Sequence, residues 1–256
     1  SYMRERYAAP GRMILGSDSH TRYGAYGTMA IGEGGPELAR QLLQKTYDIS
    51  YPRVIAIYLT GAPRPGVGPQ DVTLDLIAAT FRDGVVKNAV LEFFGPGVAS
   101  LAMDYRSGID CMSTETTCLS TVWSTDDTVK EHMQVLGRGD QFKAQSPEDG
   151  AYYDELIEID LGKVEPMIAL PFHPSNAYTI REFKANMEDL LHQVDLDTAE
   201  QLGVKNAAPL RNKIVDGQFR VDQGVVAGCS GGTYQNLVRV AEILGNHTLG
   251  SDAFWL

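Results

Sequence analysis

Cysteine is scarce in this sequence, and long apolar runs are absent. The 256 residues include three cysteines, Cys111, Cys118 and Cys229, which is too few and too odd a number for a disulfide framework. This usage predicts a reducing compartment, either the cytoplasm or a mitochondrial matrix. No apolar run is long enough to cross a bilayer, and the opening residues, Ser-Tyr-Met-Arg-Glu-Arg, lack the apolar core of a signal peptide. We therefore expect no membrane partner.

Acidic residues outnumber basic ones. The chain has 22 Lys and Arg against 33 Asp and Glu, which gives a net charge of −11. A nucleic-acid binder needs a basic surface to neutralise phosphates, so we expect no nucleic-acid partner. Nucleotide motifs are also missing. No GK[ST] sequence occurs, and the glycines of GAYGTMAIGEGG (24–35) do not form G-x-G-x-x-G after a strand.

Strand-like segments alternate with helical ones along the chain. Composition predicts a strand end at Ile14-Leu15 and strands at 53–61, 89–97 and 154–161. Apolar spacing and end signals predict helices at 36–47, 69–84, 99–105, 108–119 and 124–139. We expect a linker or crossover at 162–187, a weak helix at 186–203, and a short strand, glycine turn and helix at 223–245. Such alternation is typical of α/β architecture with mainly parallel sheets.

Three polar residues, Asp18, Ser19 and His20, follow the apolar pair Ile14-Leu15. In α/β folds, ligand sites gather beyond the carboxyl ends of strands. Asp can orient or transfer a proton, Ser can hydrogen-bond a carboxylate, and His acts as acid or base near neutral pH. The alternative is a polar turn with a capping Asp and a structural His, and the local sequence leaves both readings open.

Two residues farther along the chain are further candidates. Glu115 lies in a stretch with few other charges, where a buried carboxylate would need a partner such as an imidazole. Cys229 lies in a glycine-rich turn before a predicted helix, whose exposed N–H groups favour a thiolate that serves as metal ligand or nucleophile. The alternatives are an exposed helical glutamate and a small buried cysteine.

A separate metal site is another hypothesis. Cys111 and Cys118 are seven residues apart and share one face of a helix, so they could join Cys229 around zinc or iron. Apolar packing of these two cysteines is the competing interpretation. The remaining histidines are interpreted as loop or surface residues: His132, His173, His192 and His247.

Taken in order, these motifs resemble the aconitase superfamily of iron–sulfur hydro-lyases, which includes aconitase and 3-isopropylmalate dehydratase. GSDSHT (16–21) resembles the family's G-[ST]-D-S-H-T element, and the glycine-rich stretch after it also matches. Further matching segments follow at about the family's spacing: YPRVIAIYLTG (51–61), EFFGPGVASL (92–101), STETT (113–117), YYDELIEIDL (152–161) and GCSGGTYQNL (228–237). The resemblance covers nearly the whole chain.

The resemblance implies aconitase-like three-layer α/β domains with mainly parallel sheets. Residues 1–53 would be the C-terminal part of a first domain, 54–171 a second, and 172–256 the start of a third. It also implies site roles. Asp18, Ser19 and His20 would contact a hydroxy di- or tricarboxylic acid, with Asp18 helping to protonate the departing hydroxyl, and Glu115 would pair with the histidine.

The resemblance further implies that Cys229 is the first of three cysteines holding a 4Fe-4S cluster. The other two form a C-x-x-C pair in the family, and no cysteine follows Cys229 here. Where the family has G-S-C-T-N, this chain has Ser230 and Gly231 after the cysteine, and Cys111 replaces an asparagine. We therefore expect an internal fragment of a hydratase, inactive without its remaining domains or subunit. The competing hypothesis is a catalytically silent paralogue that serves as a binding or regulatory scaffold.

Overall fold

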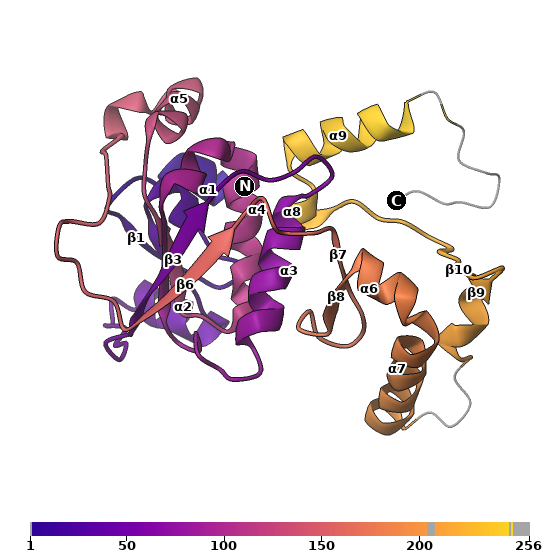
Figure 1. Ribbon diagram of the computed structural model, residues 1–256. Helices are drawn as coiled ribbons and strands as arrows, with labels where there is room; N and C mark the ends of the chain where they lie inside the picture. Colours follow the sequence, from indigo (N-terminus) through magenta and orange to yellow (C-terminus); the bar gives the residue numbers. More distant parts are fainter. Residues whose placement is uncertain (1, 204–207, 246, 248–256) are drawn as a thin grey trace.

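A parallel four-stranded sheet is the centre of the chain. The computed structural model describes residues 2–203, 208–245 and 247, and Figure 1 shows its arrangement. The strands, in the spatial order β5-β4-β3-β6, are β5 (Ser120–Trp123), β4 (Val90–Phe94), β3 (Val54–Thr60) and β6 (Glu155–Asp160), and every neighbouring pair is parallel. The predicted α/β architecture with a mainly parallel sheet is confirmed.

Helices connect the strands, as the sequence predicted. They are α3 (Pro69–Thr80), α4 (Met103–Met112) and α5 (Asp127–Val135), with the short 3-10 turns η2 (Pro96–Ser100) and η4 (Gly139–Gln141) between elements. The start of α3 is fixed by Pro69 in its first turn and by the Asp71 carboxylate, which accepts the Gly68 N–H at 2.6 Å.

One face of this sheet forms the main core. Fully buried side chains such as Ile57, Leu91 and Phe93 belong to one cluster with Leu76 of α3 and Ile109 of α4. The same cluster includes Ala8, Ala25 and Tyr26, from the segment before residue 53. The predicted boundaries at 53 and 171 stay predictions.

A second parallel pair lies beside the main sheet. It consists of β1 (Met13–Gly16), which the sequence predicted, and β2 (Met29–Gly32), which it did not. The Ser120 hydroxyl of β5 donates to the Ala30 carbonyl at 2.7 Å and ties the pair to the main sheet. In the chain, α1 (Tyr2–Tyr7) precedes β1, the turn η1 (Gly24–Tyr26) lies between β1 and β2, and α2 (Gly35–Leu42) follows β2.

The helix predicted at 108–119 is wrong in its second half. The helix α4 ends at Met112, and the turn η3 (Ser113–Thr116) follows before β5. The Ser113 and Thr116 hydroxyls donate to carbonyls three residues earlier in the chain, and Thr117 has φ 66°. These local bonds compete with helix continuation. The helix predicted at 99–105 is likewise divided between η2 and the start of α4.

The C-terminal part forms smaller units. Residues 162–187, predicted as a linker, contain a hairpin of β7 (Met167–Ala169) and β8 (Ala177–Thr179) and the helix α6 (Ile180–Ala185). The predicted weak helix is α7 (Met187–Leu202), and a second core forms around Phe183 and Leu191. Figure 1 shows these elements on one side of the main sheet, followed by η5 (Leu210–Lys213) and the hairpin of β9 (Ile214–Val215) and β10 (Gln218–Phe219).

The strand predicted within 223–245 is wrong. Val225 and Val226 are exposed and lie outside any strand, because no neighbouring strand pairs with them in the described chain. The predicted glycine turn and helix are present as α8 (Gly228–Gly231) and α9 (Tyr234–Leu244). None of the helices in the described ranges is long and apolar enough to span a membrane.

Candidate active site

The turn after β1 carries three of the candidate residues. The Asp18 carboxylate accepts the backbone N–H of His20 at 2.7 Å, and the Asp18 carbonyl accepts the N–H of Thr21 at 2.9 Å. The Ser19 hydroxyl lies 3.1 Å from Nδ1 of His20. The triplet therefore begins at the carboxyl end of a strand, and its own hydrogen bonds fix the backbone that aims His20.

Close packing with β2 holds this turn in place. A Cβ at Gly32 would lie 2.2 Å from the carbonyl oxygen of Asp18, so the strand end can approach the turn only where no side chain is present. The side chain of Asp18 itself is three-quarters exposed, and that of His20 is one-third exposed. Both groups are open to a ligand.

Glu115 lies against His20, although the two residues are 95 positions apart in the sequence. Oε1 of Glu115 is 3.3 Å from Nε2 of His20, and the two side chains are about equally exposed, at 31% and 33%. The Thr114 hydroxyl donates to the Ser19 carbonyl at 2.8 Å, which fastens η3 to the turn after β1. A carboxylate beside Nε2 fixes the orientation of the ring.

Cys229 lies in α8, which packs on α4. The Ser230 hydroxyl donates to the Gly108 carbonyl at 3.0 Å and accepts from the Gln70 amide at 3.2 Å. The neighbouring Cys111 thiol and the charge of His20 together lower the pKa of Cys229 to about 6, against partial burial and Asp18, which raise it.

The hypothesis of a three-cysteine metal site does not fit the structure. Cys111 and Cys118 are both buried, and the Cys118 sulfur donates to the Ser113 carbonyl at 3.4 Å. Within residues 2–203, 208–245 and 247, no three His, Cys, Asp or Glu side chains are arranged to hold a metal ion. The expected shared helix face is absent as well, because α4 ends at Met112 and Cys118 lies beyond it.

Two site-supporting residues, Arg22 and Thr114, escaped the sequence analysis. The buried guanidinium of Arg22 donates to the Thr114 hydroxyl at 3.3 Å and to the Cys118 carbonyl at 3.0 Å. It therefore holds η3 beside the turn that carries His20. Arg22 follows GSDSHT directly, but its inward direction depends on tertiary packing and has no local sequence signal.

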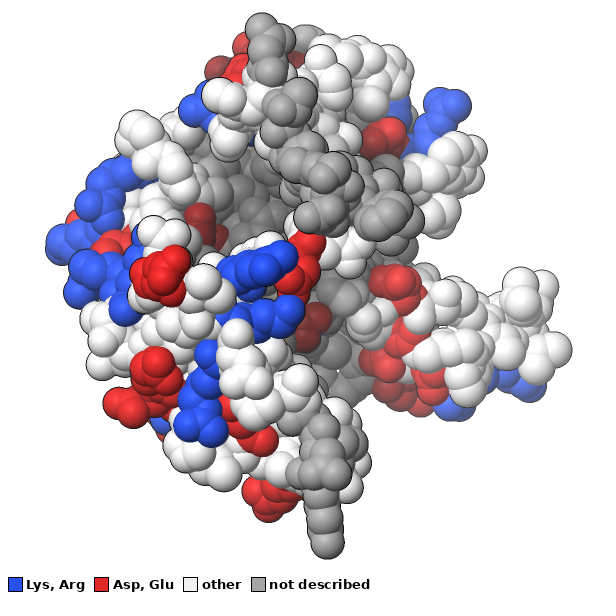
Figure 2. All heavy atoms as spheres, turned by 90° about the vertical axis from the view of Figure 1, so that its right-hand side faces the viewer, with Lys and Arg blue, Asp and Glu red and all other residues white. Residues whose placement is uncertain are grey.

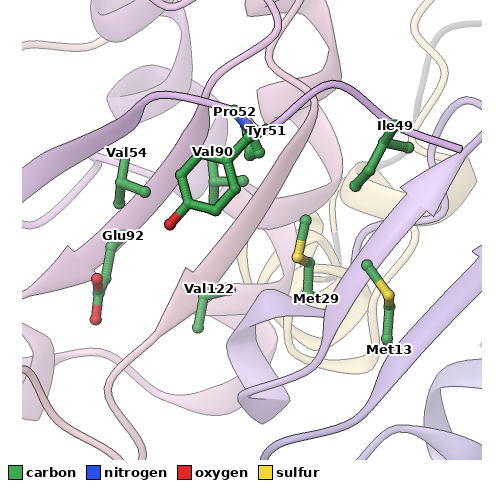
Figure 3. Close-up of a pocket in the computed structure, with 9 residues that line it drawn as sticks. All are labelled: Met13, Met29, Ile49, Tyr51, Pro52, Val54, Val90, Glu92 and Val122. Carbon is green, nitrogen blue, oxygen red and sulfur yellow. The ribbon is translucent and has the colours of Figure 1, made fainter. Parts of the chain in front are cut away.

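An apolar pocket of 450 Å³ lies elsewhere, at the amino-terminal ends of the strands (Figure 3). Met13, Met29, Val54 and Val90 begin β1, β2, β3 and β4, and all four line it. The candidate acid–base residues lie in the turn after β1 and in η3, and none of them lines the pocket. The pocket is therefore not part of the candidate active site.

Glu92 is the carboxylate of this pocket, and it permits a pH test. Burial raises the pKa of Glu92, while the hydrogen bond from Tyr153 opposes the shift. The folded chain therefore holds this proton more tightly than the unfolded chain, and the free energy of unfolding falls as pH rises through the interval between the two pKa values. We expect Glu92→Gln to raise the urea midpoint at pH 7, with the gain vanishing as pH falls below about 4. The matched control is the exposed Glu148→Gln, and an equal gain in both variants would contradict the assignment.

The arrangement is that of an α/β protein whose candidate acid–base residues come from the turn after β1 and from η3. The comparisons with known proteins define the class further. The aconitase family (aconitate hydratase) matches residues 1–253, and the chain belongs to that family.

Individual curated relatives support the same family. The mitochondrial aconitate hydratase of Candida albicans is 28% identical over 98% of this chain and 30% of its own length. The 3-isopropylmalate dehydratase large subunit of Elusimicrobium minutum is 34% identical over 71% of this chain and 44% of its own length. The mitochondrial aconitate hydratase of Saccharomyces cerevisiae is 28% identical over 94% of this chain and 29% of its own. The chain thus spans less than half the length of these relatives.

Proposed function

We propose that this chain is the part of an aconitase-like hydro-lyase that carries acid–base and substrate-binding groups for the reversible dehydration of a hydroxy di- or tricarboxylic acid. The observation that carries the proposal is the contact between Nε2 of His20 and the Glu115 carboxylate, in a chain that belongs to the aconitase family. The remaining domains or a second subunit of the same enzyme complete the site.

Each proposed role follows from the position of the side chain. Asp18 is open to ligand and gives a proton to the departing hydroxyl, and the Ser19 hydroxyl hydrogen-bonds a substrate carboxylate. His20, held by Glu115, orients and exchanges a proton with the substrate or with water. These steps are proton transfers and hydrogen bonds, which suit a turn that is one-third to three-quarters exposed.

Cys229 fits one ligand position of a 4Fe-4S cluster. Its thiol is exposed, and its lowered pKa favours the thiolate that binds iron. Cys118 is buried, and its thiol is hydrogen-bonded to the Ser113 carbonyl. The third cysteine of the sequence, Cys111, is also buried. The other cluster ligands therefore come from outside this chain. When bound, the cluster supplies a Lewis acid for the substrate's hydroxyl and carboxylate.

A catalytically silent scaffold is the second candidate. In its favour, Ser230 directs its hydroxyl inward to Gly108 and Gln70, and Cys111 stands where the family resemblance implies an asparagine. Lys and Arg lie among Asp and Glu on the face drawn in Figure 2, so this face is not the continuous basic surface that a nucleic-acid partner needs. The mitochondrial relatives support a mitochondrial matrix location, and the cytoplasm is the other reducing compartment that we propose.

Reconstitution of the full-length protein separates the two functions. The protein is loaded with iron and sulfide under argon, its absorption spectrum is recorded, and a panel of hydroxy acids is assayed. Cluster absorption with turnover supports the hydro-lyase, whereas cluster absorption without turnover supports the scaffold. We expect the isolated 256-residue chain to be inactive, and turnover by that chain alone would contradict the proposal.

A further inference from the structure

The second face of the main sheet is only partly covered by the described residues. On the core face, Ile57, Phe93 and Trp123 are paired across the strands and are all 0% exposed. Side chains alternate between the two faces, so Glu92 and Leu156 lie on the other face. Glu92 is half-buried there, and Leu156 is 65% exposed. Parallel sheets are typically covered on both faces, so this face lacks the cover that its architecture calls for.

The apolar pocket joins this face to the β1–β2 pair. It reaches from Met13 and Met29 to Val122 of β5, as Figure 3 shows, and Met13 is 60% exposed. We refer to the continuous surface from Met13 to Leu156 as the open face. Apolar surface of this kind is stabilised when an apolar partner removes it from water.

Glu92 gives the open face a negative charge without a counter-charge. Its Oε2 accepts the Tyr153 hydroxyl at 3.1 Å, and the Tyr153 ring stacks on Phe94 with centroids 5.5 Å apart. None of the described Lys, Arg or His side chains forms an ion pair with Glu92, and the other described residues that line the pocket are uncharged. A carboxylate in apolar surroundings needs a cation once water is excluded from it.

We propose that the open face is the docking surface for an apolar segment of the same protein outside residues 1–256, and that this segment places a Lys or Arg side chain on Glu92. The inference rests on the proposed function only in taking this chain as part of a longer protein. The chain spans 30% of the Candida albicans relative and 44% of the Elusimicrobium minutum relative. Proteins of that length have ample polypeptide to cover such a face.

A second copy of this chain suits the open face less well. A symmetric contact through it would bring two Glu92 carboxylates into one apolar interface. The chain also carries a net charge of −11, which opposes self-association. A segment from elsewhere in the protein can cover the apolar side chains and supply the cation as well.

Hydroxyl-radical footprinting of the 256-residue chain and of the full-length protein tests the docking. Met13 and the 96%-exposed Tyr51, which both line the pocket, should be oxidised severalfold more slowly in the full-length protein, because the docked segment removes them from water. Val135 of α5, which is 86% exposed and lies outside the open face, is the reference for both rates. Equal rates in the two proteins would overturn the proposal. Protection that appears in the 256-residue chain alone as its concentration rises would also overturn it, since the occupant would then be a second copy.

Glu92→Gln tests the cation separately. In the 256-residue chain this variant is expected to raise the urea midpoint at pH 7, whereas in the full-length protein it should lower the midpoint, because the docked cation loses its partner. The matched control is the exposed Glu148→Gln, whose small effect should have the same sign in both proteins. A raised midpoint for Glu92→Gln in both proteins would overturn the proposed cation. Neither measurement uses turnover or a cluster, so failure of this proposal is distinguishable from failure of the proposed function.

Discussion

His20→Ala in the full-length reconstituted enzyme is expected to lower kcat about 10²- to 10⁴-fold, the usual contribution of a positioned acid–base group. The expectation rests on the two groups that hold this imidazole: the Ser19 hydroxyl lies 3.1 Å from Nδ1, and the Glu115 carboxylate lies 3.3 Å from Nε2. Glu115→Gln keeps an oxygen at the same place but removes the charge, so it should lower kcat by a smaller factor. Initial rates on the preferred hydroxy acid measure both effects.

The control for these variants is His192→Gln. His192 lies on α7, is exposed, and is remote in sequence from the turn after β1. It should leave both kcat and KM at their wild-type values. Equal cluster absorbance in all variants verifies that each enzyme is loaded. A His20→Ala enzyme that turns over within a factor of about two of wild type would contradict the acid–base role.

Asp110→Ala is expected to lower the free energy of unfolding by about 3 kcal/mol, because it leaves buried donors without an acceptor. The fully buried Asp110 carboxylate accepts the Ala25 N–H at 3.2 Å and the Trp123 indole N–H at 3.3 Å, and the Thr121 hydroxyl also donates to it. It thereby joins α4, η1 and β5. Burial raises the pKa of Asp110, which means that it disfavours the charged carboxylate. An uncharged side chain that keeps an acceptor oxygen is therefore tolerated better than truncation to alanine.

Urea unfolding of the 256-residue chain measures this effect. Asp110→Asn keeps one acceptor oxygen without the charge and should lose less stability than Asp110→Ala. The matched control is Asp83→Ala, since Asp83 is exposed and should change the free energy of unfolding by no more than about 0.5 kcal/mol. Equal midpoints for Asp110→Ala and Asp83→Ala would show that the buried carboxylate does not tie these elements together.

Much of the fold could be predicted from local sequence patterns. The strands β3, β4 and β6 and the helices α3 and α5 lie within their predicted ranges, because composition and end signals such as Pro69 act on neighbouring residues. The errors have tertiary causes. The strand β2 is only four residues long and depends on its pairing with β1, and the chain at Val225 and Val226 has no strand to pair with.

The candidate site shows the same division. GSDSHT predicted a polar turn at a strand end, and the structure places that turn there, but the catalytic and ligand roles of its residues stay predictions. The residues next to Glu115 in the sequence do not specify its partner. Hydrogen bonds of Arg22 and Thr114 hold η3 beside the turn after β1, and they join segments far apart in the sequence. The position of Cys229 likewise depends on the packing of α8 against α4.

The sequence by itself determined the α/β class, the family and the chemical types of the candidate groups, since these depend on residue identity and short-range periodicity. Only the tertiary structure decided which groups meet. Hydrogen bonds and packing between segments far apart in the chain bring His20 to Glu115 and set α8 on α4. Such contacts are set by the energy of the whole fold, and no local pattern encodes them.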